Sequence, residues 1–518
     1  MLALGLDAST QSLTAVVIDI DSGAVVHQRQ LNYDRDLPQY GTRHGVLPHP
    51  DPAIVHAPPL MWVEALDRLL GALGDSVDVA RIAAIAGSAQ QHGSVYLRAC
   101  FAERLAALRP ERPLVEQLAD VCARPTAPVW LDSSTAEDCR ALDAALGGPA
   151  ETQRITGSAA YERFTGPQIR RCARCEPEVW AQTAHVRLVS SFLASLLAGR
   201  LADTDWGDAS GMNLMDLERK QWHPPALAAC AADLAPRLGE PIAPWTVLGP
   251  IAPALAARYG FARDCRIVAW TGDNPASSIG LGLVRDGHCA ISLGTSDVLF
   301  AISSRRPSMP PAGHVFISPT GAYMALFCFA NGSLAREAVR DAHHLDWAGF
   351  SAALARTPPG NAGRLMLPWF RPEIVPKVLR AGVVRANLSP GDTDADCRAV
   401  VEAQFTSMRL RAEAAGLQPT LLHATGGAAQ NAAILQVAAD VFQCPVRRSQ
   451  VTNTAALGAA LRAAQALPNG PGWDELVARV VEPQLAAPIA PRRDTAEIYR
   501  RLAQQYAELE ARELAARR

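Results

Sequence analysis

Residues 2–20 of the chain read LALGLDASTQSLTAVVIDI. The apolar residues up to Leu6 predict a strand, the polar residues 7–12 predict a turn, and residues 13–20 predict a second strand. A turn at residues 21–23 contains Gly23, and the sequence after it predicts a third strand from Ala24. The segment therefore predicts an antiparallel meander.

A second predicted strand–turn–strand pattern occurs near residue 290. Residues 289–293 (CAISL) predict a strand, residues 294–297 (GTSD) a turn, and residues 298–302 (VLFAI) another strand. Both predicted hairpins carry hydroxyl groups in the turn, which suggests that one domain plan occurs twice. The length of 518 residues agrees, because single cores rarely grow beyond about 250–300 residues. We expect two domains, at residues 1–282 and 283–518.

Predicted helices and strands alternate along the rest of the chain. Apolar residues recur at helical spacing from Val63 to Leu73, and a short strand follows at residues 82–85. Later strands at 267–270 and 420–423 end in the segments TGDN (271–274) and GG (426–427), the second followed by a helix at 431–442. Asp494 and Glu497 predict a capping box for a last helix. The alternation indicates the α/β class.

Composition excludes several kinds of partner. The formal charge of -2 gives no basic footprint for nucleic acid or an anionic membrane, so we expect a small-molecule partner. Residues 2–7 lack the basic leader of a secretory signal, and prolines and glycines interrupt the longest uncharged segment, so we expect a soluble cytoplasmic protein. Eleven scattered cysteines fit reduced thiols. The pair Cys172 and Cys175 has no second ligand pair, and its role stays open.

The lysines limit the possible nucleotide chemistry. The sequence contains only Lys220 and Lys377, and neither stands in the Gly-Lys-Ser/Thr setting of a P-loop or in the strand motif of a protein kinase. Any phosphate must therefore be held without a dedicated lysine.

Both hydroxyl-rich turns have a composition that can hold phosphate through backbone N–H groups and side-chain hydroxyls. Asp7 in the first turn is placed to hold Mg²⁺, which prefers oxygen ligands. Taken alone, serine and threonine in a hairpin turn are ordinary turn residues, which is the alternative interpretation of either turn. The glycines at 426–427 allow a flat ligand to approach the backbone and Asn431 can reach a base or ribose, although close packing of strand and helix is the alternative.

Three further residues are candidates for catalysis or sugar binding. Asp273 follows a buried strand, where it can act as a general base or cap the next helix. His92 lies beside two glutamines, a set suited to sugar hydroxyls, although a loop histidine is usually a surface group. Arg163 has five fixed donors for a polyol or a phosphate, and a salt bridge is its more common role.

Six strings in chain order resemble the FGGY family of carbohydrate kinases: DRDLP (34–38), QQHGSV (90–95), YERFTG (161–166), TGDNPAS (271–277), SLGTSD (292–297) and ATGGA (424–428). The resemblance reaches residue 463 and implies two RNase H-like domains of the actin and hexokinase type, with a cleft between them. It implies that the first domain binds the sugar and the second the nucleotide.

The resemblance also implies roles for matching residues. Four would contact the sugar, with Asp273 as the base: His92, Arg163, Asp273 and Asn274. Four would contact the adenosine part of ATP: Trp347, Gly427, Ala428 and Asn431. Five would hold the phosphates and Mg²⁺: Asp7, Thr10, Gly294, Thr295 and Ser296.

The segment after Asp132 refines the expected substrate. Many bacterial relatives have an arginine shortly after a Trp-x-Asp sequence, whereas Trp130-Leu131-Asp132 is followed here by Ser133 and Ser134. This pattern is similar to the animal-type members that phosphorylate D-xylulose with ATP. A kinase for another ketose or polyol and a non-catalytic ATP-binding sugar sensor remain alternatives, and both a monomer and a homodimer stay open.

Overall fold

The computed structural model describes residues 1–389 and 391–517, which form two compact units. The first unit contains residues 1–284, 316–322 and 451–483. The second unit contains residues 285–315, 323–450 and 484–518, described except for residues 390 and 518. Among the described residues, we find no helix with the length and apolar character needed to span a membrane.

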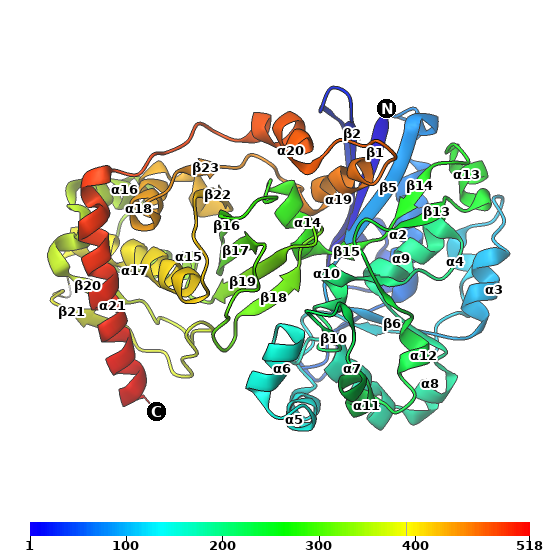
Figure 1. Cartoon of the computed structure of the whole chain (residues 1–518), viewed down its shortest axis with the longest axis horizontal. Helices are drawn as coiled ribbons and strands as arrows, with labels where there is room; N and C mark the ends of the chain where they lie inside the picture. Colours follow the sequence, from blue (N-terminus) through cyan, green and yellow to red (C-terminus); the bar gives the residue numbers. More distant parts are fainter. Residues whose placement is uncertain (390, 518) are drawn as a thin grey trace. The chain divides into compact units, whose positions relative to one another are not determined.

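A mixed sheet forms the centre of the first unit (Figure 1). Its meander is antiparallel as predicted, and β5 and β14 then add parallel to β1 and β5 respectively. The order across the sheet is β13-β14-β5-β1-β2-β3, with β15 also paired to β5. The strands are β1 (Leu2–Ala8), β2 (Ser12–Asp19), β3 (Val25–Asn32), β5 (Ile82–Ala89), β13 (Val247–Pro250), β14 (Arg266–Val268) and β15 (Thr271–Gly272).

The sheet of the second unit repeats this plan. Its order is β18-β19-β17-β16-β22-β23, in which three antiparallel strands (β19, β17, β16) are followed by two parallel ones. The strands are β16 (His288–Leu293), β17 (Asp297–Ser303), β18 (His314–Ile317), β19 (Tyr323–Phe329), β22 (Leu421–Thr425) and β23 (Val446–Arg448). The predicted duplication is confirmed, and both sheets have the RNase H-like strand order.

Helices cover both faces of the first sheet. Successive residues of a strand point to opposite faces, so Leu4 and Leu6 pack into the core formed with α2 (Pro59–Gly71) and α9 (Val189–Ala198). Gly5 faces α19 (Thr454–Gln465), where a Cβ atom on Gly5 would lie 2.0 Å from the Ala456 carbonyl oxygen. The helix therefore approaches the strand closely because Gly5 has no side chain.

The boundary near residue 284 agrees with the expected 282, but the expected run from 283 to the end of the chain is interrupted. Residues 316–322 and 451–483 belong to the first unit. The reason is steric fit, because α19 packs against α14 (Asp273–Gly280) at Gly458 and Gly280 as well as against β1. A prediction from chain order could not anticipate this return of the chain.

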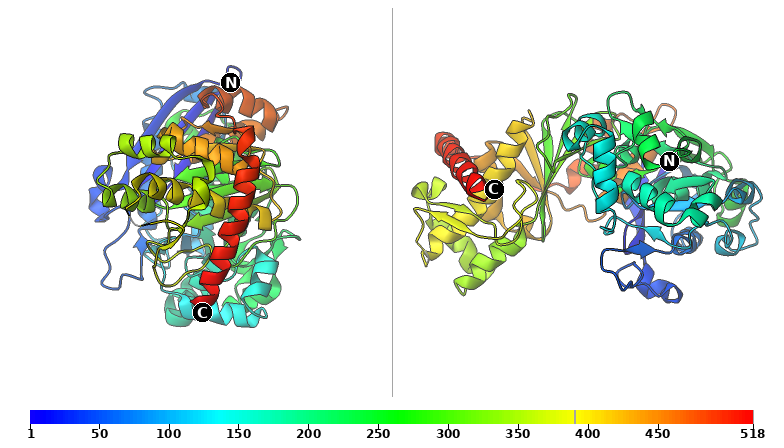
Figure 2. Two further views of the ribbon diagram at one scale, coloured as in Figure 1. Left: turned by 90° about the vertical axis from the view of Figure 1, so that its left-hand side faces the viewer. Right: turned by 90° about the horizontal axis from the view of Figure 1, so that it is seen from below.

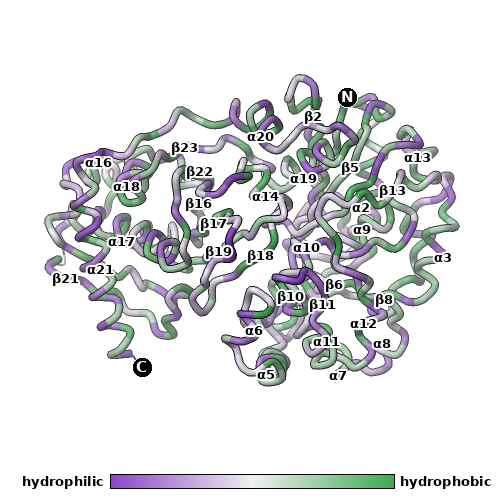
Figure 3. The backbone as a smooth tube through the Cα atoms, viewed as in Figure 1, coloured by the Kyte–Doolittle hydropathy of each residue, from purple (hydrophilic) through white to green (hydrophobic). Residues whose placement is uncertain are grey.

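The second unit is covered by long helices, and α21 (red in Figure 2) packs against α17 and α18. Figure 3 shows α21 alternating between hydrophobic and hydrophilic residues, as expected for a helix with one buried stripe. Tyr499, Leu502 and Tyr506 supply that stripe. The helices are α15 (Ser333–Ala342), α16 (Trp347–Arg356), α17 (Thr393–Ala414), α18 (Ala432–Phe442) and α21 (Ala496–Ala516).

The capping box expected for α21 is wrong. The helix begins at Ala496 with Thr495 as its cap, and no side chain makes a capping hydrogen bond. Glu497 instead forms ion pairs with Arg500 and Arg501 on its own helix. These pairs use the carboxylate that the capping box would have needed.

The remaining elements are shorter. The other helices of the first unit are α1 (Tyr33–Asp36), α3 (Cys100–Ala106), α4 (Leu114–Gln117), α5 (Ala136–Ala145), α6 (Pro149–Thr156), α7 (Thr165–Cys175), α8 (Pro177–Gln182), α10 (Trp206–Ala209), α11 (Pro224–Cys230), α12 (Ala235–Leu238), α13 (Pro253–Tyr259) and α20 (Trp473–Leu476). Two-stranded pairs are β4 (His56–Ala57) with β7 (Ala127–Pro128), β6 (Ser94–Leu97) with β8 (His185–Leu188), β9 (Thr204–Asp205) with β12 (Pro241–Ile242), β10 (Met215–Asp216) with β11 (Gln221–Trp222), and β20 (Leu365–Leu367) with β21 (Val384–Ala386).

Candidate functional site

Two predicted site carboxylates lie at the carboxyl edge of the first sheet. Asp7 on β1 is opposite Ser88 on the parallel strand β5, and Ser88 is opposite Thr271 on β15. Asp273 follows β15 directly as the first residue of α14. Ligands of α/β sheets bind at this edge, where parallel strands end together. The fold therefore brings Asp7 and Asp273 to the place where a ligand is expected.

Asp7 is a buried carboxylate with one hydroxyl partner. The Ser88 Oγ donates a hydrogen bond of 2.8 Å to the Asp7 Oδ1. Burial and the negative charge of Asp273 raise the Asp7 pKa to about 7, although the Ser88 hydrogen bond opposes this rise. The carboxyl group is therefore near half ionised at neutral pH unless a cation approaches it.

Asp273 is half-buried and held by backbone and side-chain amides. Its Oδ1 accepts hydrogen bonds from the Asn274 N–H at 2.7 Å and from the Asn274 Nδ2 at 2.9 Å, and the Gln91 N–H also donates to the carboxylate. Burial raises the Asp273 pKa to about 6, and these hydrogen bonds limit the increase. The N-cap of α14 is Gly272, so Asp273 is not the cap that the alternative role required.

His92 is buried and fixed in one tautomer. Its Nδ1 lies 2.8 Å from the Gly211 carbonyl oxygen, which can only accept, so Nδ1 carries the proton and Nε2 of the neutral ring is an acceptor. The ring stacks on Phe164 with centroids 4.3 Å apart. Its φ of +73° is uncommon for a residue with a side chain, which indicates that the surroundings determine the loop conformation. His92 is therefore not the surface group of the alternative interpretation.

Arg163 lies among aromatic rings. Its guanidinium carbon is 4.6 Å from the Tyr161 ring centroid and 5.6 Å from that of Trp130. No carboxylate in the described part of the chain forms an ion pair with it, so the salt-bridge alternative is not the observed arrangement. The Trp130 Nε1 donates to the Thr10 Oγ1 at 2.8 Å. The first hydroxyl-rich turn and Arg163 are thus linked through one indole ring.

Asp132 has a structural role. Its carboxylate accepts hydrogen bonds from the Val55 N–H at 2.9 Å, the Ser134 N–H and Oγ at 3.0 and 2.6 Å, and the Gln168 Nε2 at 2.8 Å. Burial alone would raise its pKa, but hydrogen bonds from His56, Ser134 and Gln168 hold the pKa well below its usual range. These donors occupy the carboxylate, which fixes the segment after Trp130.

Two buried carboxylates near Asp273 have no counterpart in the sequence interpretation. Asp205 caps α10 by accepting the Asp208 N–H at 2.9 Å, and the Ser190 hydroxyl donates to Asp208. Burial raises the pKa of both groups, and the charges of Asp205 and Asp273 raise that of Asp208 further. The sequence signal that could have indicated this pair is two aspartates three residues apart in the segment TDWGDASG (204–211).

The nearby cation is Arg462 of α19, whose Nη2 lies 4.0 Å from the Asp205 Oδ2. Arg462 is 2% exposed and donates to the carbonyl groups of Gly87 at 3.0 Å, Pro244 at 2.9 Å and Ala269 at 2.6 Å. Because Gly87 belongs to β5 and Ala269 follows β14, this side chain fixes the strand ends that lead to His92 and Asp273.

In the second unit, two predicted turns lie side by side. β16 and β22 run parallel with Ser292 opposite Thr425, so residues 294–296 and 426–428 follow at the same sheet edge. A Cβ atom on Gly426 would lie 2.5 Å from the Leu293 carbonyl oxygen, whereas one on Gly427 would meet no atom within 4 Å. Gly426 therefore allows the close packing, and Gly427 leaves open backbone. Thr295 and Ser296 are exposed.

Asn431 and Trp347 are also brought together. Asn431 caps α18, because its Oδ1 accepts the N–H groups of Ala433 and Ile434 at 3.0 and 3.2 Å. Its Nδ2 donates to the Ser351 Oγ at 2.7 Å, and that hydroxyl donates to the Trp347 carbonyl oxygen at 2.8 Å. The exposed Trp347 ring is 39% accessible and packs against Arg340. These hydrogen bonds through Ser351 join the first residue of α16 to the N-cap of α18.

The cysteine pair on α7 has one buried and one exposed member. Cys172 is buried and Cys175 is exposed on α7, and both thiols are free. In the described ranges, no three histidine, cysteine or acidic residues are grouped so that they could hold a metal ion.

Comparison with known proteins identifies matches in both units. Residues 125–280 match the N-terminal domain, and residues 289–467 the C-terminal domain, of the FGGY family of carbohydrate kinases.

Similar proteins match over nearly the whole chain. The chain is 42% identical to the xylulose kinase of Rattus norvegicus over 98% of this chain and 96% of that protein. It is 40% identical to xylulose kinase 2 of Arabidopsis thaliana over 91% and 87%. The solved xylulose kinase structure from Rhodospirillum rubrum has the same fold, with a TM-score of 0.83, 21% identity, and coverage of 99% and 98%.

Proposed function

The chain belongs to the FGGY family of carbohydrate kinases, and on this premise we propose that it phosphorylates D-xylulose with ATP to give D-xylulose 5-phosphate and ADP. The observation that carries the reaction is the Asp273 carboxylate, held by Gln91 and Asn274 beside Asp7 at the sheet edge. The identity of 42% with a xylulose kinase supports the choice of sugar.

Asp273 is the general base of the proposed reaction. As the C5 hydroxyl oxygen attacks the γ-phosphorus, the Asp273 carboxylate takes its proton, a new O–P bond forms, and the bond between the γ-phosphorus and the bridging oxygen breaks. The bonding electrons leave with ADP. A base with a pKa of about 6 is ionised at neutral pH and still accepts a proton readily.

The sugar contacts proposed are His92, Arg163, Asp273 and Asn274. With the Nδ1 proton directed at the Gly211 carbonyl oxygen, the neutral form of His92 presents Nε2 as a hydrogen-bond acceptor for a sugar hydroxyl. Arg163 donates to sugar oxygens without first breaking an ion pair. Asn274 is already fixed by Asp273 and by the Gln91 Oε1 at 2.9 Å, so its amide is pre-oriented.

The residues of the second unit suit ATP. We propose that Gly294, Thr295 and Ser296 hold phosphate oxygens through exposed N–H and hydroxyl groups. The open backbone at Gly427 and Ala428, with Trp347 and Asn431, holds the adenosine part. Thr10 supplies a further hydroxyl to the phosphates in the same proposal.

Asp7 is the proposed protein ligand of Mg²⁺. The site fits this ion, which is usually bound by one or two carboxylates together with substrate phosphates and water. Burial and the charge of Asp273 raise the pKa of Asp7 to about 7, so a bound cation would favour the ionised form of this carboxylate. When bound, Mg²⁺ supplies positive charge that neutralises the phosphate oxygens.

The proposal places the enzyme in the cytoplasm as a soluble protein without nucleic-acid or membrane partners. The cysteines from Cys100 to Cys444 that the structure describes are free thiols, and free thiols are typical of a reducing compartment such as the cytoplasm. The proposal covers both a monomer and a homodimer.

The rate of the reaction should fall at acidic pH. Burial raises the pKa of Asp273 to about 6 and that of Asp7 to about 7. A base works only when it is unprotonated, so kcat/KM should be constant well above pH 7, fall about tenfold per pH unit just below it, and fall more steeply below about pH 6, where both carboxyl groups are protonated. Because Asp7 and Asp273 interact, the fall of kcat/KM at acidic pH reports the two carboxyl groups together and not one of them alone. Direct ADP quantitation as a function of pH measures it, and an inflection near the ordinary carboxyl value of about 4 would contradict a buried base.

A panel of free sugars tests the substrate. ADP release should be fastest with D-xylulose, with kcat/KM at least about tenfold above that for other ketoses and polyols, because one correctly placed hydroxyl is worth this factor or more. A different preferred sugar would replace D-xylulose and leave the kinase assignment intact. Tight ATP binding without sugar-stimulated ADP release would favour a sugar sensor, since that role keeps the phosphate turns and needs no base.

A further inference from the structure

The phosphate turn at residues 294–296 rests on a buried ion pair. Asp297, directly after the turn, is 1% exposed, and Arg336 of α15 is 0% exposed. The Arg336 Nη1 donates to the Asp297 Oδ2 at 2.7 Å and its Nη2 to the Asp297 Oδ1 at 3.0 Å. This two-point contact fixes both the position and the plane of the carboxylate.

The same carboxylate holds the turn itself. The Gly294 N–H donates to Asp297, and the Ser333 N–H donates to the Gly294 carbonyl oxygen at 2.8 Å. A Cβ atom on Gly332 would lie 2.6 Å from the Asp297 nitrogen, so α15 begins in direct contact with the base of the turn. The Arg336 Nη2 also donates to the Ser333 Oγ at 2.9 Å. Both ends of the turn are thus attached to the first turn of α15.

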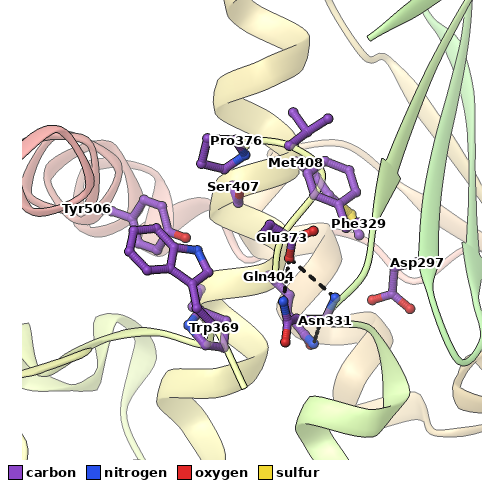
Figure 4. Close-up of a pocket in the computed structure, with 13 residues that line it drawn as sticks. Asp297, Phe329, Asn331, Trp369, Glu373, Pro376, Gln404, Ser407, Met408 and Tyr506 are labelled. Carbon is purple, nitrogen blue, oxygen red and sulfur yellow. Dashed lines mark hydrogen bonds between the residues drawn. The ribbon is translucent and has the colours of Figure 1, made fainter. Parts of the chain in front are cut away.

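Polar side chains behind Arg336 complete the support. The Gln404 Oε1 accepts from the Arg336 Nη1 at 2.7 Å, and the Gln404 Nε2 donates to the carbonyl groups of Asn331 and Gly332 at 2.7 and 2.9 Å. Glu373 accepts the Ala330 N–H at 2.6 Å and the Asn331 Nδ2 at 2.8 Å. Figure 4 shows Asp297, Asn331, Glu373 and Gln404 gathered around one cavity.

The cavity does not provide a ligand site of its own. Its volume is about 20 Å³, which is room for about one water molecule. The charged groups around it therefore need another explanation than ligand binding. The exposed turn that they hold, with Thr295 and Ser296 facing solvent, is the part of this assembly that a ligand can reach.

We propose that Arg336 is a positioning residue for nucleotide binding, which holds the 294–296 turn through Asp297 in the conformation that receives the ATP phosphates. The inference rests on the proposed function for the identity of the ligand. Phosphate bound by backbone N–H groups needs those groups to converge before binding, because ordering them during binding lowers affinity. A single guanidinium that contacts Asp297, Ser333 and Gln404 supplies this order.

Replacing Arg336 by methionine should raise the KM and the calorimetric Kd for ATP at least about tenfold, because the turn loses its fixed carboxylate. The KM for D-xylulose should change less than about twofold, since Arg336 belongs to the second unit. The melting temperature should fall as well, because Asp297 is left buried without its cation.

A matched control separates positioning from loss of stability. Arg398 of α17 is also buried, at 3% exposure, and pairs with Glu402 at 2.7 Å and with Tyr499. Arg398→Met should lower the melting temperature similarly without changing ATP binding. Equal effects of both variants on ATP affinity, or no effect of either, would overturn the proposal.

If the Arg336→Met protein does not fold, the conservative variant Arg336→Lys still tests the proposal. Arg336→Lys keeps the charge, but one ammonium cannot reproduce the two parallel contacts with Asp297. Its Kd for ATP should rise at least about threefold, and a folded Arg336→Lys protein with the wild-type Kd would overturn the proposal. Calorimetry with ATP alone keeps this test separate from the choice of sugar, because an incorrect sugar assignment would appear only in the sugar panel.

Discussion

Replacement of Asp273 by asparagine should lower kcat by about 10²- to 10⁴-fold, the range by which a positioned base accelerates proton transfer. The amide oxygen of asparagine can still accept hydrogen bonds from Gln91 and Asn274, so the loop keeps its shape. The amide cannot take the proton of the attacking hydroxyl. The KM for D-xylulose should therefore change little, and steady-state ADP release at saturating sugar measures the loss.

Asp67→Asn is the matched control for this experiment. Asp67 is a buried carboxylate of α2 that accepts hydrogen bonds from the Leu114 N–H, Arg258 and the Tyr259 hydroxyl. Removing its charge should lower stability but leave kcat per folded molecule near the wild-type value. If the Asp273→Asn protein keeps more than about a tenth of the wild-type kcat, the assignment of the base is wrong.

Replacement of Gly458 by alanine should destabilise the first unit by about 3 kcal/mol or more, at or above the upper end of ordinary overpacking. A Cβ atom there would lie 1.9 Å from the Ala276 carbonyl oxygen and 2.9 Å from the Gly280 nitrogen. Both contacts are with the backbone of α14, so no side chain can rotate away and the two helices must separate. The melting temperature should fall by about 6 °C or more.

The same substitution should also reduce activity, because α14 begins with Asp273. A shift of that helix moves the proposed base relative to the Gln91 N–H. Gly71→Ala is the control, since Gly71 is the last residue of α2 and a Cβ atom there meets nothing within 4 Å. Its melting temperature should stay constant or rise slightly. A Gly458→Ala protein as stable as wild type would refute the close packing of α14 and α19.

Local sequence patterns predicted the two hairpins, because alternating strands and their turns depend on neighbouring residues. The position of Asp273 directly after a strand was predicted for the same reason, whereas Asp7 was predicted in the turn and lies within β1, which continues to Ala8. The ordered strings supplied the family. The capping box at Asp494 failed, since the Glu497 carboxylate had closer partners in Arg500 and Arg501. The return of residues 451–483 to the first unit was also missed.

The sequence by itself determined the α/β class, the duplicated hairpin, the absence of a lysine-based phosphate site and the candidate residues of the site. The tertiary structure decided how those residues are held. Arg462 and Arg336 each meet their partners across long separations in the chain, and neither carries a local pattern that distinguishes it from a surface arginine. Their roles follow from burial, because a charge removed from water must be paired, and burial is decided only when distant segments pack together.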